Sequence, residues 1–69
     1  MNLNMEFKVI KYKRINDKYY VLYEMTKEMW CVVVYDENEE EILFSCVELS
    51  YTTALHKYNQ VKDNPKEYL

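Results

Sequence analysis

The fold of this chain is decided by residues 29–48, MWCVVVYDENEEEILFSCVE. Two mainly apolar runs, 29–35 and 41–48, flank a short polar segment. Both runs are rich in the β-branched and aromatic residues that favour strands. Apolar runs of this length separated by a few polar residues are typical of an antiparallel hairpin, so we expect these two runs to pair.

The polar segment between the two runs sets the register of this hairpin. Asn38 tolerates positive φ better than its acidic neighbours, so we expect it at the tip, next to Glu39. The predicted cross-strand pairs are then Tyr35–Ile42, Val33–Phe44 and Cys31–Cys46. In this register both faces of the hairpin are apolar, whereas a sheet with one face in water alternates apolar and polar positions. One helix covers one face, so the other must be covered by sheet curvature, by a second copy of the chain or by a target protein.

Two further strands are expected before this hairpin. The pattern at about residues 5–14 alternates apolar and polar positions and changes phase near Val9 and Ile10, which predicts a strand with a bulge there. Asn16-Asp17 is a turn signal, because both residue types tolerate positive φ. A strand rich in Tyr and Val follows at 18–26.

The C-terminal part of the chain changes to a helical pattern. Ser50 is a suitable N-cap, apolar residues at helical spacing follow it, and Asn64-Pro65 ends the helix. We therefore predict an α+β fold in one small domain over residues 1–69: a four-stranded antiparallel meander sheet followed by one C-terminal helix (β-β-β-β-α). The expected bounds are about 5–14, 18–26, 29–35 and 41–48 for the strands and about 51–63 for the helix.

The composition excludes several kinds of chemistry. The chain has 69 residues and no glycine, so it has no glycine-rich loop for phosphates or dinucleotides and no glycine-flanked nucleophile turn. Cys31, Cys46 and His56 do not have the paired spacing of a zinc site. Both cysteines lie in apolar strands, so we expect buried reduced thiols, with a cross-strand disulfide as the alternative. We predict no enzyme activity, no metal and no cofactor.

The chain also lacks the segments that direct proteins to membranes or out of the cell. The longest apolar run, residues 29–35, is far shorter than a membrane span, and the first residues lack the apolar core of a secretory signal. We therefore expect a soluble protein of the cytoplasm, that of the host cell if a phage encodes it.

The net charge of −3 conceals a strong asymmetry along the chain. Residues 1–27 carry a net charge of +3, residues 28–56 carry −7 and residues 57–69 carry +1. Acidic residues in a row are able to occupy a site built for phosphates, so the leading hypothesis is a protein-binding module that contacts a basic, nucleic-acid-binding protein. The expected contact residues are Asp36, Glu37, Glu39, Glu40 and Glu41. In size and charge the chain resembles the anti-CRISPR-like inhibitors that phages and mobile elements direct against host defence proteins.

The basic first part of the chain supports a different hypothesis. Lysines interleaved with tyrosines are typical of surfaces that hold single-stranded nucleic acid, because ring faces stack on bases and cations hold the backbone. The residues expected to do this are Lys11, Tyr12, Lys13, Arg14 and Tyr20. The negative whole-chain charge makes this the alternative and not the leading hypothesis. A homodimer is a further possibility, because a chain this short has a small core.

Overall fold

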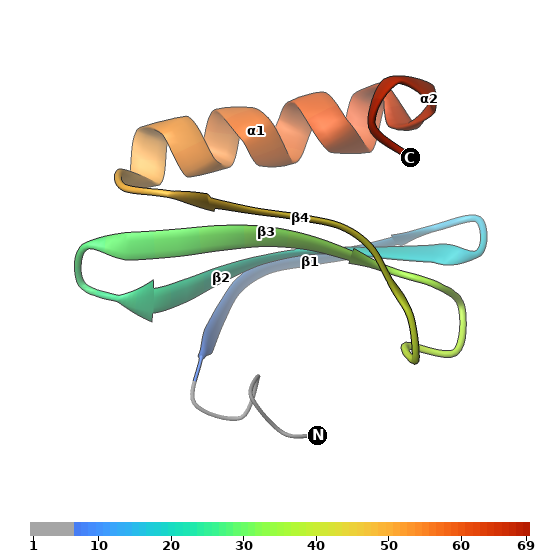
Figure 1. Ribbon diagram of the computed structural model, residues 1–69, viewed down its shortest axis with the longest axis horizontal. Coiled ribbons are helices and arrows are strands. Elements are labelled where there is room, and N and C mark those ends of the chain that lie inside the picture. Colours follow the sequence, from blue (N-terminus) through green and yellow to red (C-terminus); the bar gives the residue numbers. More distant parts are fainter. Residues whose placement is uncertain (1–6) are drawn as a thin grey trace.

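The computed structural model describes residues 7–69, which form one antiparallel sheet and two helices (Figure 1). The elements are β1 (Lys8–Ile15), β2 (Lys18–Thr26), β3 (Met29–Tyr35), β4 (Ile42–Glu48), α1 (Tyr51–Asp63) and α2 (Pro65–Tyr68). The strand order β1-β2-β3-β4 confirms the predicted meander and the α+β fold class. The start of the first predicted strand, residues 5 and 6, lies outside the described residues.

The first hairpin has the bulge that the sequence predicts. Val9 pairs with Tyr23 and Lys11 pairs with Leu22, so Ile10 is the extra residue in β1. Asn16 in the turn has φ 57°, in the left-handed region that Asn tolerates. After the bulge, Lys11 lies on the same face of the sheet as its cross-strand partner Leu22.

The predicted register of the second hairpin is correct beside the loop and wrong beyond it. Tyr35 pairs with Ile42 as expected, but the register then shifts by one residue at a bulge in β4. The pairs are Val34–Phe44, Val33–Ser45, Val32–Cys46 and Cys31–Val47, in place of the predicted Val33–Phe44 and Cys31–Cys46. A shift of one residue moves side chains to the other face. Cys31 and Cys46 therefore lie on opposite faces of the sheet, and both are free thiols.

The loop of this hairpin also differs from the prediction in its backbone. Glu39, not Asn38, has the positive φ, at 58°. The reason is the hydrogen bonding of Asp36, whose carbonyl accepts from the N–H of Glu39 at 3.0 Å and whose N–H donates to the carbonyl of Glu41 at 3.0 Å. These bonds place the turn one residue later than the residue types suggest.

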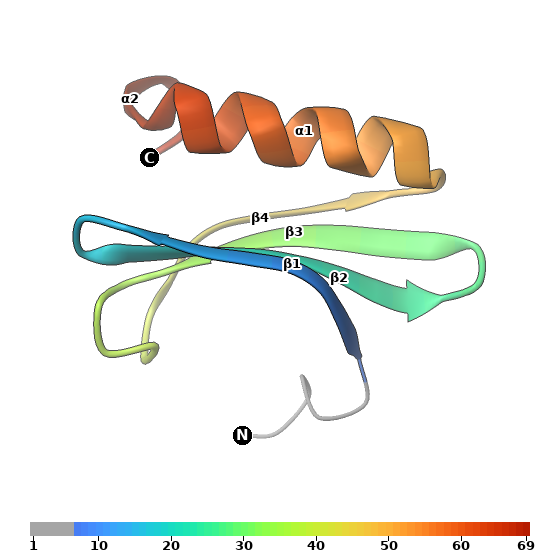
Figure 2. The same cartoon turned by 180° about the vertical axis from the view of Figure 1, so that it is seen from behind.

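Helix α1 covers one face of the sheet, as Figures 1 and 2 show from two sides. Its bounds are those predicted, and the Ser50 hydroxyl caps it by accepting from the Thr53 N–H at 3.2 Å. The fully buried residues on this face are Tyr20, Leu22, Val32 and Val34 from the sheet and Ala54, Tyr58 and Val61 from the helix. The tail forms the short helix α2, in addition to the one predicted helix. Its Tyr68 ring packs edge-on against Phe44, with centroids 5.6 Å apart.

The second face of the sheet is buried as well, although no helix within residues 7–69 covers it. Its central side chains are at most 8% exposed: Val21, Tyr23, Cys31, Val33 and Tyr35. The sheet is curved, and both the start of β1 and the tip of the β3–β4 hairpin bend away from α1 towards this face (Figure 1). Phe7, Tyr19 and Met25 pack around the buried cluster. Neither helix within residues 7–69 has the length and apolar character of a membrane span.

Candidate functional site

The acidic loop, residues 36–41, is held in shape by its first residue. The Oδ1 atom of Asp36 accepts from the backbone N–H of Glu40 at 2.9 Å and from that of Glu41 at 3.2 Å. These bonds, that from Glu40 above all, hold the pKa of the Asp36 carboxyl below its usual range. Asp36 was expected to contact a partner, but in the structure its carboxylate first serves to position the rest of the loop.

The other four predicted contact residues of the loop are exposed, and none of them forms an ion pair within the described residues. They are Glu37, Glu39, Glu40 and Glu41. Within residues 7–69 the ion pairs are Lys18–Asp17 and Lys62–Asp63, both outside the loop. Like charges crowded on one short loop repel one another, so a cation brought close would lower the energy of the loop.

A hollow of about 270 Å³ lies beside this loop, on the sheet face opposite α1. Four tyrosines and one loop carboxylate line it, together with Val9 and Val21. We call these five residues the tyrosine pocket: Tyr12, Tyr19, Tyr23, Tyr35 and Glu39. Tyr19 pairs with Tyr35 across β2 and β3, and Glu39 of the loop lines the same hollow.

The tyrosines differ in their exposure within the pocket. Tyr23 and Tyr35 are buried, and their hydroxyls share a hydrogen bond of 2.9 Å. Burial, and next the bond with Tyr35, raises the pKa of Tyr23 above its ordinary value, so this hydroxyl stays neutral. Tyr12 is 54% exposed, and its ring lies 5.6 Å from that of Tyr19. The pocket therefore has a fixed neutral floor and an exposed aromatic rim.

The lining of this pocket suits a positively charged group. The face of an aromatic ring attracts ammonium and guanidinium groups, and a nearby carboxylate adds direct attraction. The chain shows this at the pocket rim, where the Arg14 guanidinium carbon lies 5.6 Å from the centroid of the Tyr19 ring. The structure thus joins Tyr12, expected to stack on nucleic acid, with Glu39, expected to contact a protein.

The residues of the nucleic-acid hypothesis do not form one surface. Lys11 and Lys13 lie on the face of the sheet that α1 covers, while Tyr12 and Arg14 lie on the opposite face. Tyr20 is 2% exposed in the core under α1, so its ring is not available for stacking on a base.

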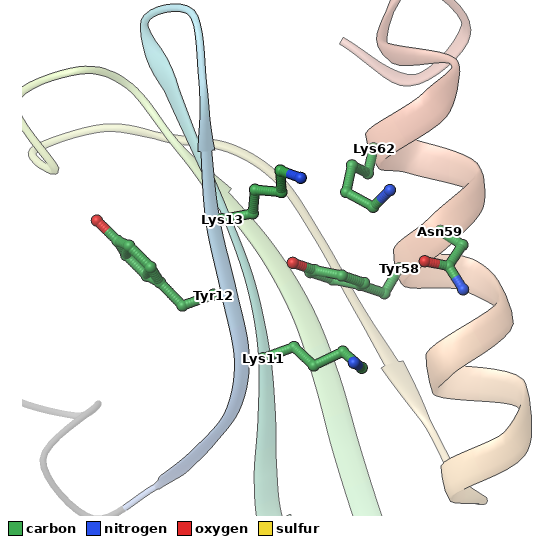
Figure 3. A pocket seen from close by; sticks show the side chains of 6 residues that line it. All are labelled: Lys11, Tyr12, Lys13, Tyr58, Asn59 and Lys62. Atoms are coloured by element: carbon green, nitrogen blue, oxygen red, sulfur yellow. The ribbon is translucent and has the colours of Figure 1, made fainter.

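The two lysines instead meet residues from the helix. A cleft of about 390 Å³ lies between β1 and α1 (Figure 3). It is lined by Lys11, Tyr12 and Lys13 of β1 and by Tyr58, Asn59 and Lys62 of α1. Asn59 and Lys62 were not predicted as site residues, because helical spacing does not indicate which strand of the sheet lies beside α1.

The described cysteine and histidine side chains do not form a metal site or a reactive cluster. Within residues 7–69 no three His, Cys, Asp or Glu side chains are placed to hold a metal ion. His56 is exposed on α1. Burial, and next the charge of Cys46, raises the pKa of the Cys31 thiol to about 11, which disfavours the reactive thiolate.

Comparison with known proteins adds no relative: no family model, no curated protein and no solved structure matches this chain.

Proposed function

We propose that this chain is a non-enzymatic protein-binding module whose acidic loop and tyrosine pocket bind a basic side chain of a partner protein. The observation that carries the proposal is the position of Glu39, which belongs to the exposed acidic loop and also lines the tyrosine pocket. One lysine or arginine of a partner would meet a carboxylate and several ring faces at the same time.

The backbone of Glu39 supports this role. A residue with a β-carbon is strained at φ 58°, and such strain persists where the surrounding structure enforces it, often at functional sites. Asn38, which would tolerate this conformation better, is the adjacent residue. The loop nevertheless places a glutamate there.

The exposed rim of the pocket supports it as well. Interface energy is concentrated in a few residues, and tyrosine is among the commonest of them, because its ring gives a large rigid contact and its hydroxyl a hydrogen bond. Tyr12 is more than half exposed on an edge strand, next to Tyr19. The surrounding carboxylates would speed the encounter with a basic surface and select against an acidic one.

The partner that fits this surface is a basic, nucleic-acid-binding protein. The lysines and arginines of such a protein are spaced to hold phosphates, and a row of carboxylates is able to take the place of those phosphates. An inhibitor of a host defence nuclease, encoded by a phage and acting in the cytoplasm, is the most specific form of this proposal. Its support is the charge and tyrosine content of the surface.

The experiment uses a fluorescent oligo-arginine peptide as the probe and follows its anisotropy. Glu39→Gln combined with Glu40→Gln should weaken binding, and the difference should shrink as salt screens the charges. The matched control combines Glu28→Gln with Glu67→Gln, which makes the same change in net charge at exposed sites away from the pocket. Equal weakening by both pairs would reduce the effect to overall charge and contradict the proposed site.

A second pair of variants tests the ring contribution. Tyr12→Ala should weaken binding by about two- to thirtyfold, the range of a cation–ring contact of about 0.5–2 kcal/mol. Tyr51→Ala, at another exposed tyrosine on α1, is the control and should leave the affinity unchanged. Unchanged binding by the Tyr12 variant would remove the aromatic part of the proposal.

A further inference from the structure

A concave, positively charged site lies between the edge strand β1 and helix α1. Lys11 and Lys13 approach it from the strand, and Asn59 and Lys62 approach it from the helix. Figure 3 shows the Lys13 and Lys62 side chains extending into the space between the two elements, with Tyr58 between strand and helix. We call these four polar residues the lysine cleft.

The bulge in β1 places the two strand lysines in this cleft. Because Ile10 is the extra residue, Lys11 lies opposite Leu22 and Lys13 opposite Tyr20, both buried under α1. Without the bulge, the two lysines would lie on the other face of the sheet, away from α1. Bulges often re-aim side chains in this way near functional sites.

Lysines on an edge strand have an ordinary structural role, which is to discourage pairing with other chains. That role accounts for charge on β1 but not for the contribution of the helix. Lys62 is largely covered, with 20% of its side chain exposed, and Asn59 adds an amide at the same cleft. Convergence from two elements is what a binding site requires.

The positive charge of the cleft is poorly compensated within the described part of the chain. Lys62 pairs at 3.0 Å with Asp63, the next residue, whose side chain is 64% exposed. Neither Lys11 nor Lys13 has an ion-pair partner within residues 7–69, and no described carboxylate lines the cleft. Three ammonium groups around one concavity repel each other, and an anion placed among them removes that repulsion.

We propose that the lysine cleft binds a phosphate group, carried either by a free nucleotide or by the backbone of a single-stranded nucleic acid. Ammonium groups bind phosphate oxygens through charge and hydrogen bonds, and the Asn59 amide supplies a further donor. The cleft and the tyrosine pocket both border Tyr12 but share no charged residue, so variants at the cleft lysines leave the carboxylate of the tyrosine pocket unchanged.

The test is an amide-resolved NMR titration with two probes, thymidine monophosphate and a single-stranded oligothymidylate. Saturable shifts should centre on Lys11, Lys13, Asn59 and Lys62. Saturation by both probes shows that a free phosphate suffices, and saturation by the oligonucleotide alone assigns the site to a nucleic-acid backbone; either result supports the proposal. Absence of shifts at these residues with both probes at low salt would overturn it.

Variants and salt make the test quantitative. For three lysines on a single strand, log K should fall with log salt with a slope of about −2, so a fourfold rise in salt weakens binding by about fifteen- to twentyfold. Lys11→Gln with Lys13→Gln should reduce the slope by more than one, whereas Lys11→Arg with Lys13→Arg should retain binding and exclude misfolding as the cause. The control, Lys27→Gln with Lys66→Gln, changes exposed lysines outside the cleft. A control that loses as much affinity as the cleft variant would refute a localised site.

Discussion

Glu39→Gly is expected to stabilise the folded chain while it weakens the proposed binding of a basic partner. Glu39 has φ 58°, and the structure keeps a β-carbon in that region. Glycine adopts the same backbone without steric cost and keeps the N–H that donates to the Asp36 carbonyl at 3.0 Å. The substitution therefore removes strain and one carboxylate without removing a backbone hydrogen bond.

The size of the effect follows from two opposing terms. A left-handed conformation costs a residue with a β-carbon roughly 1–2 kcal/mol. Glycine gives back about 0.4–1 kcal/mol of this through the greater freedom of the unfolded chain. The net gain is about 0.8 kcal/mol, the centre of a range of about 0–1.6 kcal/mol, and for a chain of this length each kcal/mol raises Tm by about 4–8 °C.

Thermal unfolding followed by circular dichroism measures this gain, and Asn38→Gly is the matched control. Asn38 does not have positive φ, so glycine there brings only the entropy cost, and Tm should fall by about 2–8 °C. Glu39→Gln keeps the strain and should leave Tm nearly unchanged while it weakens binding of the oligo-arginine peptide. A stabilising Asn38→Gly together with a destabilising Glu39→Gly would refute the turn geometry, because that pattern belongs to a loop with Asn38 at the positive-φ position.

Three further predictions test the fold beneath the sites. Because Cys31 and Cys46 lie on opposite faces of the sheet, mild oxidation should form no intramolecular disulfide, as measured by mass spectrometry. With its pKa raised to about 11, Cys31 is roughly 0.1% thiolate at about pH 8, so a disulfide reagent should modify Cys46 first; modification of Cys31 first would contradict the register. Burial raises the pKa values of Tyr20, Tyr23 and Tyr58 above those of the unfolded chain, so the unfolded chain loses these protons first as pH rises and stability falls. The urea midpoint of unfolding should therefore be steady up to about pH 9 and fall above it, less steeply in Tyr23→Phe; a midpoint that rises above that pH would contradict the burial of these hydroxyls. Ser50→Ala removes the cap of α1 and should cost about 1 kcal/mol, or about 5 °C in Tm, whereas the exposed Thr52→Ala should change Tm little, and equal effects would argue against the cap.

Local patterns predicted the elements well. The bounds of β2, β3 and α1 follow from strand composition, the Ser50 cap and Pro65, which act within a few residues of where they stand. The β1 bulge was also predictable, because it shifts the alternation of apolar residues near Ile10.

The second hairpin shows where such reasoning stops. Residue types place positive φ at Asn38, but the backbone hydrogen bonds of Asp36 place it at Glu39, and a bulge then shifts the pairing of β4. Both faces of this hairpin are apolar, so the hydrophobic pattern does not penalise a shift of one residue.

The candidate sites depend on long-range geometry that a linear pattern does not contain. The loop after β3 brings Glu39 beside Tyr12, and the position of α1 brings Lys62 beside Lys11. Strand alternation alone indicates that Tyr19 and Tyr23 share a face. The acidic and tyrosine-rich segments therefore supported two rival hypotheses, although parts of both meet in one pocket.

The most direct test of the proposed function is an NMR titration of the native chain with the oligo-arginine peptide, following amide and tyrosine ring resonances. The tyrosine pocket should respond first, with shifts at Glu39 and at the rings of Tyr12 and Tyr19, and Glu39→Gln should reduce them. Shifts confined to other surfaces, or absent at low salt, would contradict the claim that the acidic loop and the tyrosine pocket form one site for a basic side chain.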